Sequence, residues 1–121
     1  MPHRAIVANE MAKLLSVLAH PNRIRIIEEL RHGERDVNSL RDTLGISHSG
    51  VSQHLMTLRA HRVVSERRQG RQVFYQLRQP ELAAWLTEFV RFLEEDSAAA
   101  AQLGEAIKKT RAAWAVEGAE T

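Results

Sequence analysis

Four uncharged side chains recur at helical spacing between residues 49 and 56, namely Ser49, Ser52, Gln53 and Met56. At about 100° per residue they share one face of a helix, and the other face carries Val51, Leu55 and Leu58. A glutamine can pair with adenine through two hydrogen bonds, a hydroxyl can donate or accept, and a methionine can contact a thymine methyl group. This face, with Ser47 and His48 at its start, is therefore a candidate surface for reading base edges. The alternative is an exposed polar face without a ligand.

Positive charge is concentrated just after this segment. Residues 59–78 contain six Lys/Arg and one Asp/Glu, although the whole chain has a formal net charge of only +2. Arginines that neutralise phosphates release condensed counterions, so a local basic block is typical of a nucleic-acid contact. The candidate contacts to the DNA backbone are Arg59, Arg62, Arg67, Arg68 and Arg71. Solubilising charges on an edge strand are the alternative.

The candidate reading face belongs to the second of two short helices. Apolar residues at three- and four-residue spacing predict the first helix over residues 37–44. Asp36 is a suitable N-cap for it, and Gly45 is a suitable stop. Ser47 can cap the second helix, over residues 48–61. Two short helices joined by a three-residue turn that contains glycine are typical of a helix-turn-helix.

Two further helices and a hairpin flank this unit. Apolar spacing predicts helices over residues 8–18 and 21–31, separated at Pro21, because proline suits the first turn of a helix. After residue 63 the apolar residues alternate, which predicts a β-hairpin that turns at residues 69–71 and has a basic tip. The expected fold class is mainly α (α+β), with a two-stranded hairpin beside the helix-turn-helix.

The C-terminal part is predicted to hold two more helices. The first, over residues 80–95, has an apolar stripe that is unusually rich for a terminal helix and consists of Leu82, Trp85, Leu86, Phe89, Phe92 and Leu93. The second is expected to be capped by Ser97 and to end near Trp114, and its sparse apolar face must be stabilised by packing elsewhere. The tail from Glu117 is expected to be disordered.

Composition limits the other functions. A chain of 121 residues without cysteine fits one domain that has neither disulfides nor thiolate metal sites. No apolar run approaches the length of a membrane span, so we expect a cytoplasmic protein. We also expect that the protein is not an enzyme and binds no cofactor. The sequence has no glycine-rich phosphate loop and no nucleophile with a base at motif spacing.

The six histidines include no pair spaced by four residues, which argues against a metal site on one helix. A site built from His3 and acidic residues of a partner subunit is the alternative that remains. His54 lies near the apolar edge of its helix, so we expect a structural role with a hydrogen bond to a neighbouring backbone group.

Three segments in order resemble one family. Residues 18–27 (LAHPNRIRII), 46–55 (ISHSGVSQHL) and 68–75 (RQGRQVFY) are similar to the second helix, the recognition helix and the wing of the ArsR-type bacterial repressors. The resemblance covers roughly residues 8–95. It implies a winged helix-turn-helix dimer in which the first and fifth helices pair, with Leu14, Leu15 and the stripe on residues 82–93 at the interface. Family members typically leave DNA when an effector binds.

This chain departs from the metal-sensing members, because it has neither cysteines on the third helix nor histidines on the fifth. The prediction is therefore a winged helix-turn-helix domain over residues 1–95, with a further helix and tail over 96–121 that form no separate domain. Its expected function is that of a dimeric repressor of transcription at an inverted repeat in double-stranded DNA, with an unidentified effector. A winged-helix module that binds another protein is the alternative. The operator, the regulated genes, the existence of an inducer and the role of the C-terminal helix stay open.

Overall fold

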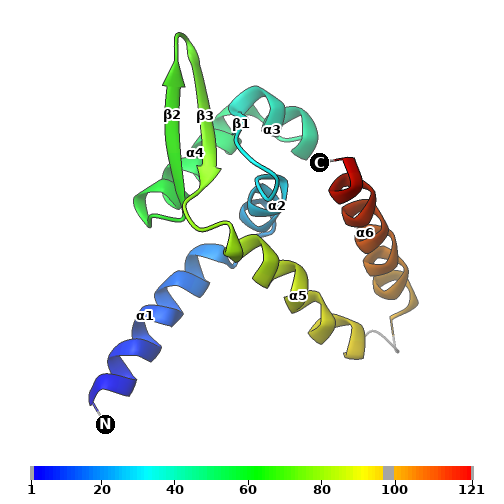
Figure 1. Cartoon of the computed structure of the whole chain (residues 1–121). Helices are drawn as coiled ribbons and strands as arrows, with labels where there is room; N and C mark the ends of the chain where they lie inside the picture. The colour runs from blue at the N-terminus through cyan, green and yellow to red at the C-terminus, as the bar shows by residue number, and fades with distance from the viewer. Residues whose placement is uncertain (1, 97–99, 121) are drawn as a thin grey trace.

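The computed structural model describes the backbone of residues 2–96 and 100–120 (Figure 1). Its elements follow one another in the order α1 (Pro2–Leu18), α2 (Pro21–Glu29), β1 (Arg35–Asp36), α3 (Val37–Leu44), α4 (His48–Ala60), β2 (Val64–Gln69), β3 (Gln72–Leu77), α5 (Glu81–Asp96) and α6 (Ala101–Glu120). Within the described ranges, every helix is too short or too polar for a transmembrane segment. The fold is mainly helical, as predicted from the sequence.

The core lies where α2, α3 and α4 meet the root of the hairpin. Its side chains with almost no exposed surface are Ile26, Ile27, Leu40, Val51, Leu55, Leu58 and Val64. Ile26 and Ile27 come from α2, and α4 contributes the three that recur at three- and four-residue spacing. Burying the full side chain of a leucine or isoleucine contributes about 1.5–3 kcal/mol, so this cluster fixes how α4 sits on the molecule.

The hairpin lies where its sequence pattern indicated, and it is part of a larger sheet. Strands β2 and β3 are antiparallel from the pair Val64 and Leu77 to the pair Gln69 and Gln72. The two-residue turn places Gly70 at φ 62°, a region that favours glycine. A third strand, β1, pairs Arg35 with Tyr75, so the sheet has the order β1-β3-β2. The prediction of a two-stranded hairpin therefore missed this short strand.

Local capping sets the bounds of the helix-turn-helix. The Ser39 backbone N–H donates to Asp36 Oδ1 at 2.9 Å, and Gly45 adopts the left-handed conformation at φ 70°. The predicted helix over 37–44 is confirmed. The predicted start of α4 at residue 48 is also confirmed, and α4 ends at Ala60, one residue before the predicted end.

The two terminal helices differ most from the prediction. Helix α1 begins at Pro2 rather than at residue 8, and its residues 2–16 are all exposed. Helix α6 extends to Glu120, so the prediction of disorder from Glu117 is wrong for residues 117–120. The reason is contact with α2 and the turn that follows it, because Trp114 Nε1 donates to Glu28 of α2 at 2.6 Å and Glu117 pairs with Arg31. The predicted Ser97 cap lies outside the described residues.

Candidate nucleic-acid interface

Three of the four side chains at positions 49–56 of the predicted reading face are exposed. Ser49 and Gln53 are exposed, Ser52 is half-buried, and Met56 keeps 69% of its surface. The opposite face of the helix is fully buried in the core through Val51, Leu55 and Leu58. The reading face is thus a rigid, uncharged ridge supported from behind.

Ser47 and Gly50 shape the N-terminus of this helix. Ser47 Oγ accepts a hydrogen bond from the Gly50 N–H at 3.0 Å and lies 3.2 Å from Ser49 Oγ. A Cβ atom at position 50 would lie only 3.1 Å from Ser47 Oγ, so glycine gives the cap its room. Ser47 is therefore first a helix cap, whereas His48 and Ser49 are exposed at the positive end of the helix, where they could contact a ligand.

Arg67 is not a free charge. Its Nη2 and Nε atoms donate to the two carboxylate oxygens of Glu34 at 2.5 and 3.1 Å, and its guanidinium lies 4.8 Å from the centre of the Phe74 ring. The hydrogen bond from Arg67 holds the pKa of Glu34 below its usual value, and the same bond raises the pKa of Arg67. Glu34 is not among the residues predicted from the sequence. Arg67 thus ties the wing to the segment before β1.

Glu66 neutralises a second part of the basic block. It accepts a hydrogen bond from the Tyr75 hydroxyl at 3.2 Å and lies 3.0 Å from Arg59 Nη1 and 4.0 Å from Arg68 Nε. Burial, and then the hydrogen bond to Glu66, raise the pKa of Tyr75. The ion pair with Arg59 joins the end of α4 to β2, so the wing and the reading helix are held together.

Two arginines of the predicted set form no ion pair with the described residues. Among the described residues, no carboxylate lies within ion-pair distance of Arg71 at the hairpin tip or of Arg62. Arg62 has a backbone role instead, because it adopts φ 60° directly after α4. Its N–H bonds to Arg59 O at 3.0 Å, and the Val63 N–H bonds to Leu58 O at 2.9 Å. This pair of bonds is a Schellman motif that ends the helix.

His54 connects α4 to α2. Its Nδ1 accepts from Arg23 Nε at 3.3 Å, and its ring centre lies 4.4 Å from that of His20. Burial lowers the pKa of His54, and the nearby charges of His20 and Arg23 lower it further. The structural role of His54 agrees with the expectation, but the predicted hydrogen bond to a backbone group is wrong, since the partner is a side chain from another helix.

Comparison with known proteins identifies the family. The sequence profile of the bacterial regulatory proteins of the arsR family matches residues 20–66. Over 96 residues the chain is 40% identical to the HTH-type transcriptional repressor SmtB of Mycobacterium tuberculosis. The aligned segment covers 79% of this chain and 70% of that protein. This chain belongs to the ArsR family of bacterial regulatory proteins.

Solved structures support the same conclusion. The transcriptional repressor BigR from Xylella fastidiosa is 33% identical, with a TM-score of 0.67 over 75% of this chain and 93% of that one. The M. tuberculosis protein Rv0081 is also 33% identical, with a TM-score of 0.68 over 77% of this chain and 94% of that one. The predicted family and the predicted winged helix-turn-helix fold are confirmed. As a member of the ArsR family, the protein is a DNA-binding regulator of transcription.

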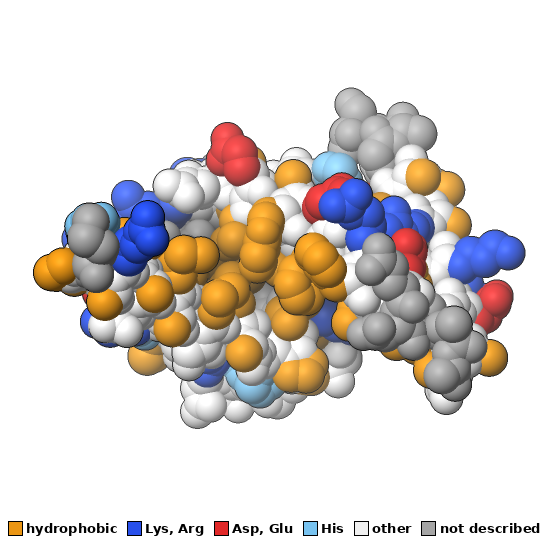
Figure 2. Space-filling view, turned by 90° about the horizontal axis from the view of Figure 1, so that it is seen from below, with side chains coloured by type: hydrophobic (Ala, Val, Ile, Leu, Met, Phe, Trp, Pro, Cys, Tyr) orange, Lys and Arg blue, Asp and Glu red, His pale blue; other side chains and the backbone are white. Residues whose placement is uncertain are grey.

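The ArsR-family protein exposes an apolar surface on α1 and α5. Figure 2 shows hydrophobic side chains gathered across this underside of the molecule. The aromatic rings of Trp85, Phe89 and Phe92 follow one another with ring centres 5.5 Å apart, and Phe92 keeps 60% of its surface. Of the predicted interface, Leu14, Leu15 and Leu93 are also exposed, whereas Leu82 and Leu86 pack partly against the protein's own core.

Metal-binding side chains are scattered in this ArsR-family chain. Over residues 2–96 and 100–120, no three His, Asp or Glu side chains come close enough to share a metal ion. His3 lies on the exposed first turn of α1. The alternative site, built from His3 and acidic residues of a partner subunit, stays a prediction.

Proposed function

We propose that this ArsR-family protein represses transcription by binding as a homodimer to an inverted repeat in double-stranded DNA. The observation that carries the proposal is the exposed, uncharged face of α4 next to a hairpin with a free arginine at its tip. Ser49, Ser52, Gln53 and Met56 would enter the major groove, and Arg71 would contact the backbone beside it. Such a protein works in the cytoplasm, where bacterial DNA lies.

The two sets of side chains would have different tasks. The uncharged reading face gains its hydrogen bonds only on the correct base edges, so it supplies specificity. Arg71 and Arg68 would interact with any phosphate, so they supply affinity that depends on salt but not on sequence. Arg67 and Arg59 are engaged by Glu34 and Glu66, so their main contribution would be to hold the wing in place.

The dimer is supported by the unusual exposure of α1. Ile6, Val7 and Met11 keep between 57% and 63% of their surface, and the aromatic residues of α5 are exposed as well. Figure 2 shows hydrophobic side chains gathered on the underside of the molecule. Most helical stability in proteins comes from packing of an apolar face, and a large exposed apolar surface marks an interaction site. Pairing α1 and α5 with those of a second copy would cover this surface. It would also present two α4 helices to successive major grooves.

Binding to the DNA upstream of its own gene would test the proposal. Repressors of this kind often control neighbouring genes, so we expect that a labelled duplex from this region is bound more tightly than a scrambled duplex of equal composition. The affinity should fall as salt rises. Equal affinity for both duplexes, or binding that does not respond to salt, would refute sequence-specific repression. It would instead favour the alternative that the winged helix binds another protein.

A further inference from the structure

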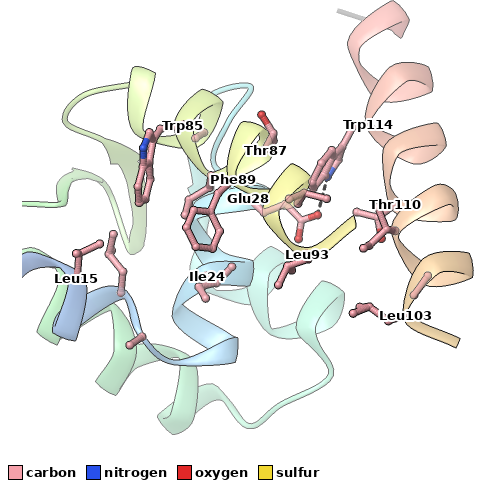
Figure 3. A pocket seen from close by; sticks show the side chains of 17 residues that line it. Leu15, Ile24, Glu28, Trp85, Thr87, Phe89, Leu93, Leu103, Thr110 and Trp114 are labelled. Carbon is pink, nitrogen blue, oxygen red and sulfur yellow. Dashed lines mark hydrogen bonds between the residues drawn. The ribbon is translucent and has the colours of Figure 1, made fainter. Parts of the chain in front are cut away.

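Helix α6 closes one side of a cavity of about 570 Å³ (Figure 3). The other walls come from the end of α1, from α2 and from α5. Small-molecule sites in proteins usually occupy about 300–1,000 Å³. The cavity therefore has the size of a ligand site, and it lies away from the proposed DNA-binding face on α4 and the wing.

The walls of this cavity are almost entirely apolar. Leu18, Ala83 and Ile107 are buried at its base, and Ile24, Phe89 and Leu93 line its sides. The polar side chains at the wall are Glu28, Thr87 and Thr110, and the indole rings of the two tryptophans add one N–H each. The Thr87 hydroxyl already donates to the Ala84 carbonyl at 2.8 Å. A ligand that fits must therefore bury apolar surface, with few groups that need hydrogen bonds.

Polar contacts hold α6 in place without filling the space beneath it. Trp114 Nε1 donates to Glu28 at 2.6 Å, Arg111 Nε donates to Glu94 at 2.5 Å, and Glu117 pairs with Arg31. Among the described side chains of α6, only Ile107 is buried. The hollow is open to solvent on one side, because Ile24, Phe89 and Leu93 in its lining keep between 41% and 45% of their surface. An apolar molecule bound there would remove this surface from water, which favours binding.

We propose that this cavity binds an uncharged, mainly apolar small molecule with one hydrogen-bond donor. The donor would meet the Glu28 carboxylate, one of whose oxygens already accepts from Trp114. Leu15, Phe89 and Leu93 in the lining also belong to the predicted dimer interface, so a second copy would cover the mouth of the cavity. Leu18 and Ile107 are buried, and they would lie beneath that contact. A compact molecule reaches all four walls.

Helix α2 links the cavity to the reading helix. Ile24 and Glu28 line the cavity, while Arg23 on the same helix donates to His54 of α4 and to the Val17 carbonyl at the end of α1. A ligand that shifts α2 would therefore also shift α4, which α2 supports. Such a ligand regulates DNA binding if its affinity differs between the arrangement of α2 and α4 that binds DNA and the arrangement that does not. This regulatory part rests on the proposed function, whereas ligand binding does not.

The two tryptophans of the chain make the test direct, because Trp85 and Trp114 both line the cavity. N-phenyl-1-naphthylamine is a suitable probe, since it is uncharged, mainly aromatic and carries one N–H. Titration of the whole protein should give saturable quenching of tryptophan fluorescence at one probe per chain. Ala106→Phe adds a ring within the cavity, so it should weaken binding about tenfold or more, a loss of about 1.4 kcal/mol.

Ala112→Phe is the matched control, because Ala112 is exposed on the same helix and does not line the cavity. It should bind the probe as the unchanged protein does. If Ala106→Phe lowers the melting temperature, Ala106→Leu gives a milder filling of the same space. The site is overturned by an absence of saturable binding, or by equal binding to the Ala106→Phe and Ala112→Phe proteins. It is also overturned by binding that appears only after Phe92→Glu breaks the dimer, which would mean that a second copy fills the cavity.

The regulatory part has its own measurement. Saturating probe should change the Kd for the upstream duplex in the unchanged protein and in Ala112→Phe, but not in Ala106→Phe. An unchanged Kd in all three would overturn regulation through this cavity. If the protein fails to bind the duplex without any probe, the proposed function fails, and the fluorescence titration still decides the binding site.

Discussion

Replacing Arg71 by alanine separates affinity from specificity most directly. Arg71 is exposed at the tip of the hairpin, and no carboxylate of the described residues lies within ion-pair distance of it. Arg67 differs, because two hydrogen bonds join it to Glu34. Arg71 can therefore neutralise a DNA phosphate without first losing an ion pair, and the substitution removes one phosphate contact from each subunit.

The size of the effect follows from counterion release. Each phosphate contact contributes about 0.9 to the slope of log K against log salt, so two subunits lose about 1.8 in slope. Between about 50 and 200 mM salt, a slope difference of 1.8 corresponds to a factor of about 12 in affinity. The unchanged protein should thus lose about 12-fold more affinity over this range than Arg71→Ala does, whatever the sequence of the duplex.

Fluorescence anisotropy with the upstream and scrambled duplexes at several salt concentrations measures both quantities. Gln53→Ala is the comparison, because Gln53 is uncharged and exposed on the reading face of α4. It should keep the salt slope and lose discrimination between the duplexes, by about 1–3 kcal/mol for a bidentate contact to a base. If the two variants gave the same profile, or if Arg71→Ala kept the full slope, the assignment of these roles would be wrong.

Three further outcomes are expected. Arg62→Gly should raise the free energy of unfolding in urea by about 1 kcal/mol, because Arg62 holds a left-handed conformation at φ 60°, and an unchanged or lower value would contradict a Schellman role. Phe92→Glu should give monomers in analytical ultracentrifugation while Ala84→Glu, an exposed change outside the aromatic row on α5, should not, and an intact Phe92→Glu dimer would rule out this interface. The pKa of His54 is lowered in the folded protein, so the unfolded chain takes up the proton first as pH falls below about 6.5 and stability decreases. The melting temperature should therefore drop more between about pH 7.5 and 5.5 than in His54→Gln, and equal drops would contradict this.

The parts predicted well are those that short-range chemistry determines. Asp36 and Ser47 accept hydrogen bonds from backbone N–H groups three residues later, and Gly45 adopts the left-handed conformation between them. Each of these interactions lies within one helical turn of sequence, so residue type and spacing are enough to place them. The bounds of α3 and the start of α4 follow directly.

The parts that were missed depend on contacts between distant residues. Glu34 and Arg67 are 33 positions apart, and Arg23 and His54 are 31 apart. No periodicity in the sequence reports such pairs, because each partner alone looks like an ordinary surface charge. Helix α6 is the extreme case, since its hydrogen bond from Trp114 reaches a residue 86 positions earlier. Its length therefore could not be predicted from its own sparse apolar face.

The Arg23 guanidinium is hydrogen-bonded both to α1, proposed to form the dimer, and to α4, proposed to read DNA. It donates to the Val17 carbonyl at 3.0 Å, at the end of the helix proposed to form the dimer, and to His54 at 3.3 Å, on the helix proposed to read DNA. The spacing between two reading helices in a dimer depends on how α4 is oriented relative to α1, and it must match half-sites that lie one helical turn of DNA, or a multiple of it, apart. A single side chain bonded to both helices restricts that orientation. Small changes at α2 would therefore alter operator binding even though α2 need not contact DNA.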